Sequence, residues 1–242
     1  MTRPLTPLSP RALLGWLLGR RPPPVGAVRF GSLRRLTPIS RVFGYDRGQP
    51  VDRHYIESFL AEHARDVRGA VVEVGDDEYT RRFGAGSVTR SDILHVSADN
   101  PRATIVADLA SADHIPSNSF DCVIVTQTLH LIFDVAAAVR TVHRVLRPGG
   151  VCLATVPGIS QVDSGAWQDY WYWSLTPAAA RRLFTEAFTG GDVGVEAHGN
   201  VLASAAFLYG LAASELSRTE LDANDPSYPL LVTIRAVKAN GA

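Results

Sequence analysis

Acidic side chains follow an apolar, strand-like run in the first half of the chain. In "VVEVGDDEYT" (residues 71–80), Glu73 lies inside the run, Gly75 ends it and Asp76 follows directly. A turn that holds a pyrophosphate against a helix N-terminus needs further glycines at these positions. Carboxylates there would repel phosphate, so NAD, FAD and ATP are disfavoured as ligands. A cationic nucleoside that carries no phosphate is compatible with this loop.

A histidine and an aromatic run could contact a second ligand. His130 comes just after the strand-like run 121–126, and an imidazole that titrates near neutrality can take a proton from a hydroxyl group. The alternative is a histidine that covers the sheet edge or orients a helix. "WQDYWYW" (167–173) supplies flat rings that stack on sugars or ring systems. We expect Trp167, Tyr170 and Trp171 to line the site of this second ligand with His130; a local hydrophobic cluster or a dimer contact is the alternative.

Metal and disulfide chemistry are not expected. The remaining histidines lack the spacing of a metal site, so no metal is predicted. Cys122 and Cys152 both lie in apolar strand-like runs, where cysteine is usually a small buried hydrophobe. Two such thiols make no disulfide framework, and we expect a cytoplasmic protein.

The elements that must position these residues alternate between helix and strand. Periodicity predicts a helix that begins at Asp52, with Asp52 as its N-cap, before a first strand at 70–74. Further strands are predicted at 92–97, 104–107, 121–126, 151–156, 192–199 and 228–238, and further helices at 77–83, 134–147, 174–188 and 201–216. Such alternation predicts parallel strands with crossover helices, and ligands at the carboxyl ends of the strands.

The first 50 residues differ in composition from the rest. They hold nine arginines against one acid, Asp46, in a chain with 24 basic and 24 acidic residues, and eight of its 15 prolines. We therefore predict an Arg/Pro-rich leader over 1–50 and one domain over 51–242, with "ALLGWLLG" (12–19) as a short docking helix. A solvated arm folded on an acidic body is favoured over one that binds nucleic acid or a membrane.

Three segments, in this order, resemble the class I S-adenosylmethionine-dependent methyltransferases, specifically small-molecule enzymes with a type 11-like domain. They are "VVEVG" (71–75), "VADLASADHIPSNSFDCVIVTQTLHLIFD" (106–134) and "AVRTVHRVLRPGGVCLATVP" (138–157). The resemblance implies a Rossmann-like α/β fold, with a mostly parallel seven-stranded sheet, helices on both faces and an antiparallel last strand. An aromatic insertion would then cover about 158–176, and a helical insertion about 200–218.

The resemblance also implies S-adenosylmethionine as cofactor, and places it on the first four strands. Its predicted contacts are Glu73, Gly75, Asp76, Ser97, Asp99, Asp108, Leu109, Thr126 and Gln127. Asp76 has an alternative role as the N-cap of the helix at 77–83. The chain departs from the family pattern at Asp77, which replaces a second glycine, and at Ser97, which replaces the acid that usually binds the ribose. Ribose could be held by Ser97 or by Asp99.

These observations predict methyl transfer from S-adenosylmethionine to a small-molecule acceptor, at oxygen of a sugar, glycoside or secondary metabolite, with His130 as base. One alternative is the same fold used for cyclase-like chemistry without methyl transfer. The other is an interaction module that has lost the cofactor and binds a partner through its leader. No nucleic-acid or membrane partner is expected, and a homodimer is left open.

Overall fold

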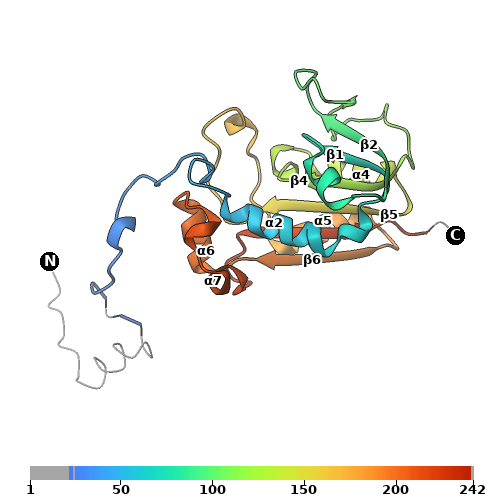
Figure 1. Ribbon diagram of the computed structural model, residues 1–242. Coiled ribbons are helices and arrows are strands. Elements are labelled where there is room, and N and C mark those ends of the chain that lie inside the picture. Colours follow the sequence, from blue (N-terminus) through green and yellow to red (C-terminus); the bar gives the residue numbers. More distant parts are fainter. Residues whose placement is uncertain (1–21, 24, 241–242) are drawn as a thin grey trace. The chain divides into compact units, whose positions relative to one another are not determined.

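The computed structural model describes residues 22–23 and 25–240, and it divides into two units, Met1–Thr37 and Pro38–Ala242 (Figure 1). In the first unit, a 3₁₀ turn η1 (Gly31–Leu33) is followed by Arg34, whose guanidinium lies 5.8 Å from the Phe30 ring centre. The docking helix predicted at 12–19 lies outside the described residues.

The second unit is built on one seven-stranded sheet, in the order β3-β2-β1-β4-β5-β7-β6. β7 is antiparallel to both of its neighbours, and the other strand pairs are parallel. This confirms the predicted fold class. The strands are β1 (Gly69–Val74), β2 (Val88–His95), β3 (Ile105–Val106), β4 (Phe120–Thr126), β5 (Leu146–Pro157), β6 (Asp192–His198) and β7 (Leu231–Val237).

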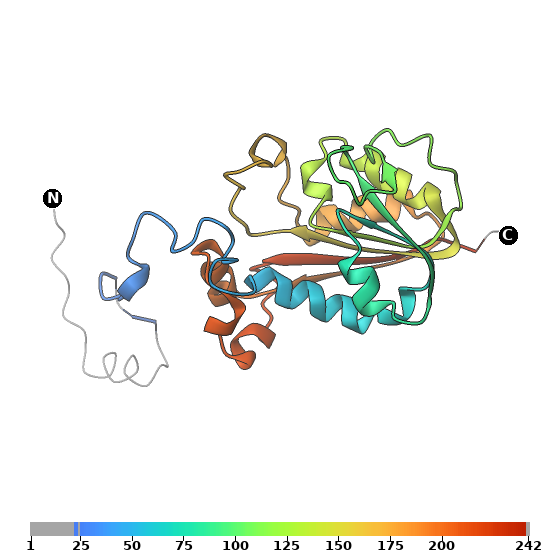
Figure 2. The same ribbon diagram turned by 45° about the horizontal axis from the view of Figure 1, so that its top comes forward.

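Helices cover both faces of this sheet (Figure 2). The helices are α2 (Val51–Glu62), α3 (Glu78–Phe83), α4 (Val135–Val145), α5 (Pro177–Ala187), α6 (Val201–Leu208) and α7 (Arg218–Asp222), with short 3₁₀ turns η2 (Ala64–Asp66), η3 (Leu129–Leu131), η4 (Gln168–Tyr170) and η5 (Ala213–Glu215). Among the described residues, every helix is too short or too polar to cross a lipid bilayer.

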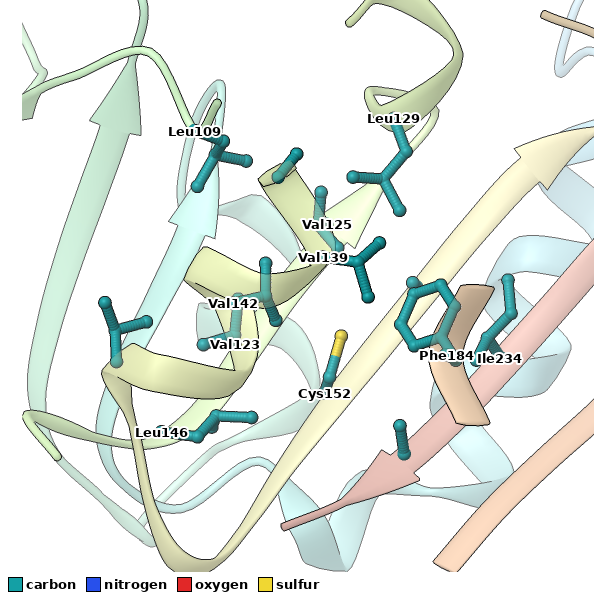
Figure 3. Packing of buried hydrophobic residues seen from close by; sticks show 14 of the residues in the cluster. Leu109, Val123, Val125, Leu129, Val139, Val142, Leu146, Cys152, Phe184 and Ile234 are labelled. Carbon is teal, nitrogen blue, oxygen red and sulfur yellow. The ribbon is translucent and has the colours of Figure 1, made fainter. Parts of the chain in front are cut away.

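Alternate residues of the central strands feed two separate apolar cores. In β1, Val72 packs with α4 and α5, whereas Val71 packs with α2 and α6 on the opposite face. Figure 3 shows the first core, where Val139 and Val142 of α4 lie over the sheet with Cys152 beneath them. Because both faces are covered, the central strands read as apolar runs, and Cys122 and Cys152 are buried free thiols as predicted.

Two predicted details are wrong. Asp52 is not an N-cap: Pro50 holds that position, and Asp52 lies in the first turn of α2. The apolar helix expected to reach residue 216 ends at Leu208, because Gly210 adopts a φ of +70° and the N–H of Leu211 bonds back to the carbonyl of Ala206. This is a Schellman turn, which needs glycine at that position.

Residues 38–50 pack on the end of the second unit formed by α6 and η5. The N–H groups of Ile39 and Ser40 both donate to the carbonyl of Tyr209, at 2.8 and 3.1 Å. The carbonyl of Gln49 accepts from Ala213, and Pro50 forms an isolated bridge with Ala212. The unit therefore begins thirteen residues before the division at Val51 that composition indicates.

Candidate active site

The strand order reverses between β1 and β4, which is where an open α/β sheet binds its ligands. The register pairs Glu73 with Ile124, so Gly75 lies level with Thr126 at the carboxyl ends of the two strands. Gly75 has a φ of +98°, and a Cβ added there would meet nothing within 4 Å. A ligand can therefore approach the backbone at Gly75, which is the use of a glycine with this conformation.

Glu73 of β1 holds the loop that follows the strand. Its carboxylate, 2% exposed, accepts the N–H of Tyr79 at 3.2 Å, the N–H of Thr80 at 2.7 Å and the hydroxyl of Thr80 at 2.7 Å. Burial raises the pKa of Glu73 to about 7, although these hydrogen bonds favour the charged form. Both oxygens are engaged with the start of α3, so Glu73 shapes the loop around the ligand position.

The two aspartates after Gly75 also have partners within the loop. Asp76 is exposed and accepts the N–H of Glu78 at 2.8 Å, but the N-cap of α3 is Asp77, so the alternative role of Asp76 as the N-cap is wrong. Asp77 forms ion pairs with Arg81, at 3.3 Å, and with Arg102. The positive charges of these two arginines offset the negative charge of Asp77. The loop after β1 is therefore less acidic than the sequence suggests.

The loop after β2 is tied to the loop after β1. Asn100 Nδ2 donates to the carbonyl of Gly75 at 2.7 Å. Ser97 Oγ donates to Asp99 Oδ2 at 2.7 Å and accepts the N–H of Asp99 at 3.1 Å. The two residues predicted to hold ribose hydroxyls are thus one hydrogen-bonded unit on a loop that reaches Gly75.

Two further predicted cofactor contacts, Asp108 and Leu109, differ in exposure. Asp108 is exposed, and its carboxylate accepts the N–H of Ala110 at 2.9 Å, which orders its own turn. The side chain of Leu109 is buried in the first core, above α4 in Figure 3. Asp108 is free to contact a ligand on its second oxygen, whereas Leu109 can offer a ligand only its backbone.

At the end of β4, Gln127 meets Asp52 of α2. Gln127 has a φ of +46°, and its N–H donates to the carbonyl of Thr155 at 3.0 Å. Its Nε2 donates to Asp52 Oδ2 at 3.0 Å. Gln127 Oε1 and Asp52 Oδ1 are both buried and find no hydrogen-bond partner among the described residues.

His130 lies in η3, directly after this turn, and is 1% exposed. Its Nδ1 is a third buried polar atom without a partner in the described part of the chain. Its ring packs at 60° to that of Trp171, with centres 4.3 Å apart, and Trp171 stacks at 6.0 Å on Phe43. Burial lowers the pKa of His130 to about 3, so the ring is neutral at physiological pH.

The aromatic insertion is held over His130 by its backbone. The carbonyl of His130 accepts the N–H groups of Tyr172 and Trp173, at 3.0 and 3.2 Å. Of the three predicted acceptor-site aromatics, only Trp171 packs against His130. Trp167 and Tyr170 are 43% and 53% exposed, on the long gold loop of Figure 1.

Sequence reasoning missed Asp52 and Asn100 as site residues. Asp52 stands at the start of the apolar stripe that continues through Tyr55, Ile56 and Phe59. A carboxylate on the core-facing side of a helix needs a buried partner, and that was the available signal. The sequence carried no comparable signal for Asn100. Among the residues that the structure describes, no three His, Cys, Asp or Glu side chains are grouped so as to hold a metal.

Residues 75–154 match the family model of the methyltransferase domain. Taken with the strand order, this match bears out the resemblance to the class I S-adenosylmethionine-dependent methyltransferases over those 80 residues. The sequence matches none of the curated proteins with which it was compared.

Solved structures with the same fold include enzymes with different reactions. An S-adenosylmethionine-dependent methyltransferase from Mesorhizobium loti is 20% identical, with 81% of this chain and 100% of that one covered and a TM-score of 0.53. A possible histamine N-methyltransferase from Thermotoga maritima is 17% identical, with 80% and 94% covered and a TM-score of 0.53. The [4+2]-cyclase SpnF is 16% identical, with 77% and 81% covered and a TM-score of 0.52. At these identities the likeness establishes the fold alone.

Proposed function

We propose that this protein transfers a methyl group from S-adenosylmethionine to a small-molecule acceptor, at an oxygen atom of a sugar, glycoside or other secondary metabolite. The observation that carries the proposal is Gly75, whose backbone is open to a ligand at the point where the strand order reverses. We place the reaction in the cytoplasm.

The residues around Gly75 fit this cofactor. The loop carries no phosphate-binding glycine motif, and Asp76 leaves an exposed carboxylate beside the glycine. In the proposal, Ser97 and Asp99 hold the ribose hydroxyls, Asp108 contacts the adenine, and Thr126 and Gln127 lie at the amino-acid end. Glu73 acts through the loop that it orders. S-adenosylmethionine supplies, when bound, a methyl group activated by a sulfonium.

His130 and Trp171 would position the acceptor. An oxygen nucleophile must lose its proton as the new C–O bond forms, and a neutral imidazole can accept that proton. His130 is unprotonated in this structure, but a ring with a pKa of about 3 holds a proton only weakly. We propose that a polar acceptor beside Trp171 makes the surroundings of the ring more polar and so increases its basicity, because burial is the cause of the low pKa.

A cyclase-like reaction is the second candidate, and one observation favours it. SpnF, which shares the fold, is a [4+2]-cyclase. The weakly basic His130 and the loss of the second glycine at Asp77 are compatible with a cofactor that is bound but not consumed.

Incubation with S-adenosylmethionine and pooled acceptors separates these functions. Methyl transfer releases S-adenosylhomocysteine and adds 14 mass units, about the mass of one CH₂ group, to one acceptor. A cyclase would change an acceptor with no mass gain and no cofactor consumed. An interaction module would bind neither S-adenosylmethionine nor S-adenosylhomocysteine in a calorimetric titration. That result would overturn the proposal.

A further inference from the structure

Two unpartnered oxygen atoms lie on one hydrogen-bonded pair at the edge of the candidate site. Asp52, 6% exposed, accepts the Nε2 of Gln127 through Oδ2, which leaves Asp52 Oδ1 and Gln127 Oε1 buried without a donor among the described residues. A buried acceptor without a donor is destabilising, and more so when it is charged. Two such atoms on one hydrogen-bonded pair indicate that a donor from outside the described residues belongs at this pair.

The charge of Asp52 narrows the kind of donor. No cation in the described part of the chain lies within 4.0 Å of the Asp52 carboxylate. The neighbouring Arg53 instead donates to the hydroxyls of Tyr45, at 2.9 Å, and Tyr79, at 3.4 Å. Arg53 attracts the Asp52 carboxylate at longer range, and a water or a hydroxyl group could donate to the pair but would bring no positive charge into contact with it. A primary ammonium has three donors and a positive charge, so it matches both needs.

The pair is held in a fixed position. Asp52 lies in the first turn of the twelve-residue helix α2, where a negative charge is favourable. Gln127 is fixed by its hydrogen bond to Thr155 and follows Thr126, which is level with Gly75. The two oxygens therefore lie at the strand ends where the cofactor and the acceptor are proposed to meet.

We infer that Asp52 and Gln127 form a recognition site for a primary ammonium group. The inference rests on the proposed function, because the cofactor and the acceptor named there are the two sources of that group. One is the α-ammonium at the amino-acid end of the cofactor, and the other is a primary amine on the acceptor. Both would donate to Asp52 Oδ1 and Gln127 Oε1.

The first arm of the test compares two cofactor products that differ only in the ammonium. S-adenosylhomocysteine and its deaminated analogue, with hydrogen in place of the α-amino group, are titrated into the wild type and Asp52→Asn. If the ammonium is the cofactor's, the wild type binds S-adenosylhomocysteine about 10- to 100-fold more tightly than the analogue. Asp52→Asn then loses that preference and keeps its affinity for the analogue.

The second arm tests the acceptor as the source. Primary amines and the matching alcohols are compared by the thermal shift they produce, with and without S-adenosylhomocysteine. If the ammonium is the acceptor's, amines raise the Tm of the wild type more than alcohols do, and Asp52→Asn removes the difference. Because the amines are also tested alone, this arm remains informative if the adenosyl compound does not bind.

Two controls separate recognition from a structural role. The Asn that replaces Asp52 can donate to Gln127 Oε1, so the unliganded variant should be at least as stable as the wild type. Asp113→Asn removes an exposed carboxylate elsewhere and should leave every preference unchanged. If neither arm shows a preference for the ammonium that Asp52→Asn removes, a bound water alone satisfies the pair and the inference is wrong. If the proposed function is wrong, the wild type instead binds neither S-adenosylhomocysteine nor its deaminated analogue.

Discussion

Asn100 donates a hydrogen bond from Nδ2 to the carbonyl of Gly75, 2.7 Å away, and so joins the loops that follow β2 and β1. A second bond, from the N–H of Arg102 to Asn100 Oδ1 at 3.0 Å, keeps the amide in this orientation. The cofactor is proposed to lie against both loops, so this link sets the spacing between its amino-acid and ribose ends.

Replacement of Asn100 by Ala should weaken binding of S-adenosylhomocysteine about 10-fold, because a loop freed from its neighbour must be ordered again when the ligand binds. Calorimetric titration measures the change. Asn224→Ala removes a similar bond, from Nδ2 to the carbonyl of Ala197 at 2.9 Å, near the far edge of the sheet. Equal losses of affinity in the two variants would mean that the link has no special part in binding.

The raised pKa of Glu73 predicts a loss of stability with increasing pH. The folded-state pKa is about 7 against an ordinary value of 4.5, so the folded state binds more protons between these values. The free energy of unfolding of the wild type should therefore fall by about 2 kcal/mol, relative to that of Glu73→Gln, as the pH rises from 5 to 8. Urea unfolding of both proteins across this range measures the difference. Parallel pH profiles would show that Glu73 is charged throughout.

The lowered pKa of His130 predicts the opposite dependence, a loss of stability with decreasing pH. The folded-state value is about 3 against an ordinary 6.5, so the unfolded chain binds more protons between these values. The wild type should lose about 2 kcal/mol of stability relative to His130→Gln as the pH falls from 7 to 5. The same urea titrations measure this change. A profile for His130→Gln that matches the wild type would place the ring in contact with water.

Truncation should separate the leader from the folded unit. Removal of residues 1–37 is expected to leave the Tm unchanged within about 2 °C, since Pro38 begins the second unit. Removal of residues 1–50 deletes the hydrogen bonds to Tyr209 and Ala213 and the ion pair of Arg47 with Glu215, and should cost about 3 kcal/mol or more. Thermal denaturation of both truncations checks this. Equal Tm values would move the boundary back toward residue 50.

The sequence was sufficient for a mostly parallel seven-stranded sheet with an antiparallel last strand, and it led us to propose a site at the carboxyl ends of the strands. Apolar runs such as that of β1 and the turn at Gly75 are local signals, and local signals locate strands. The contact between Asp52 and Gln127 was not predictable, because 75 residues separate the two in sequence. The direction of the Glu73 carboxylate depends in the same way on where Thr80 lies in α3. Sequence patterns identify residue types at a site, and the packing of whole elements decides which atoms meet.

Gly75 provides the most direct test of the account. Gly75→Arg and Gly86→Arg are matched variants, since both glycines have a positive φ and open space where a Cβ would stand. Both should be strained to a similar degree. Calorimetric titration with S-adenosylhomocysteine should show binding to the wild type and Gly86→Arg, and a loss of at least about 100-fold in Gly75→Arg. Undiminished binding to Gly75→Arg would contradict the placement of the cofactor at the end of β1.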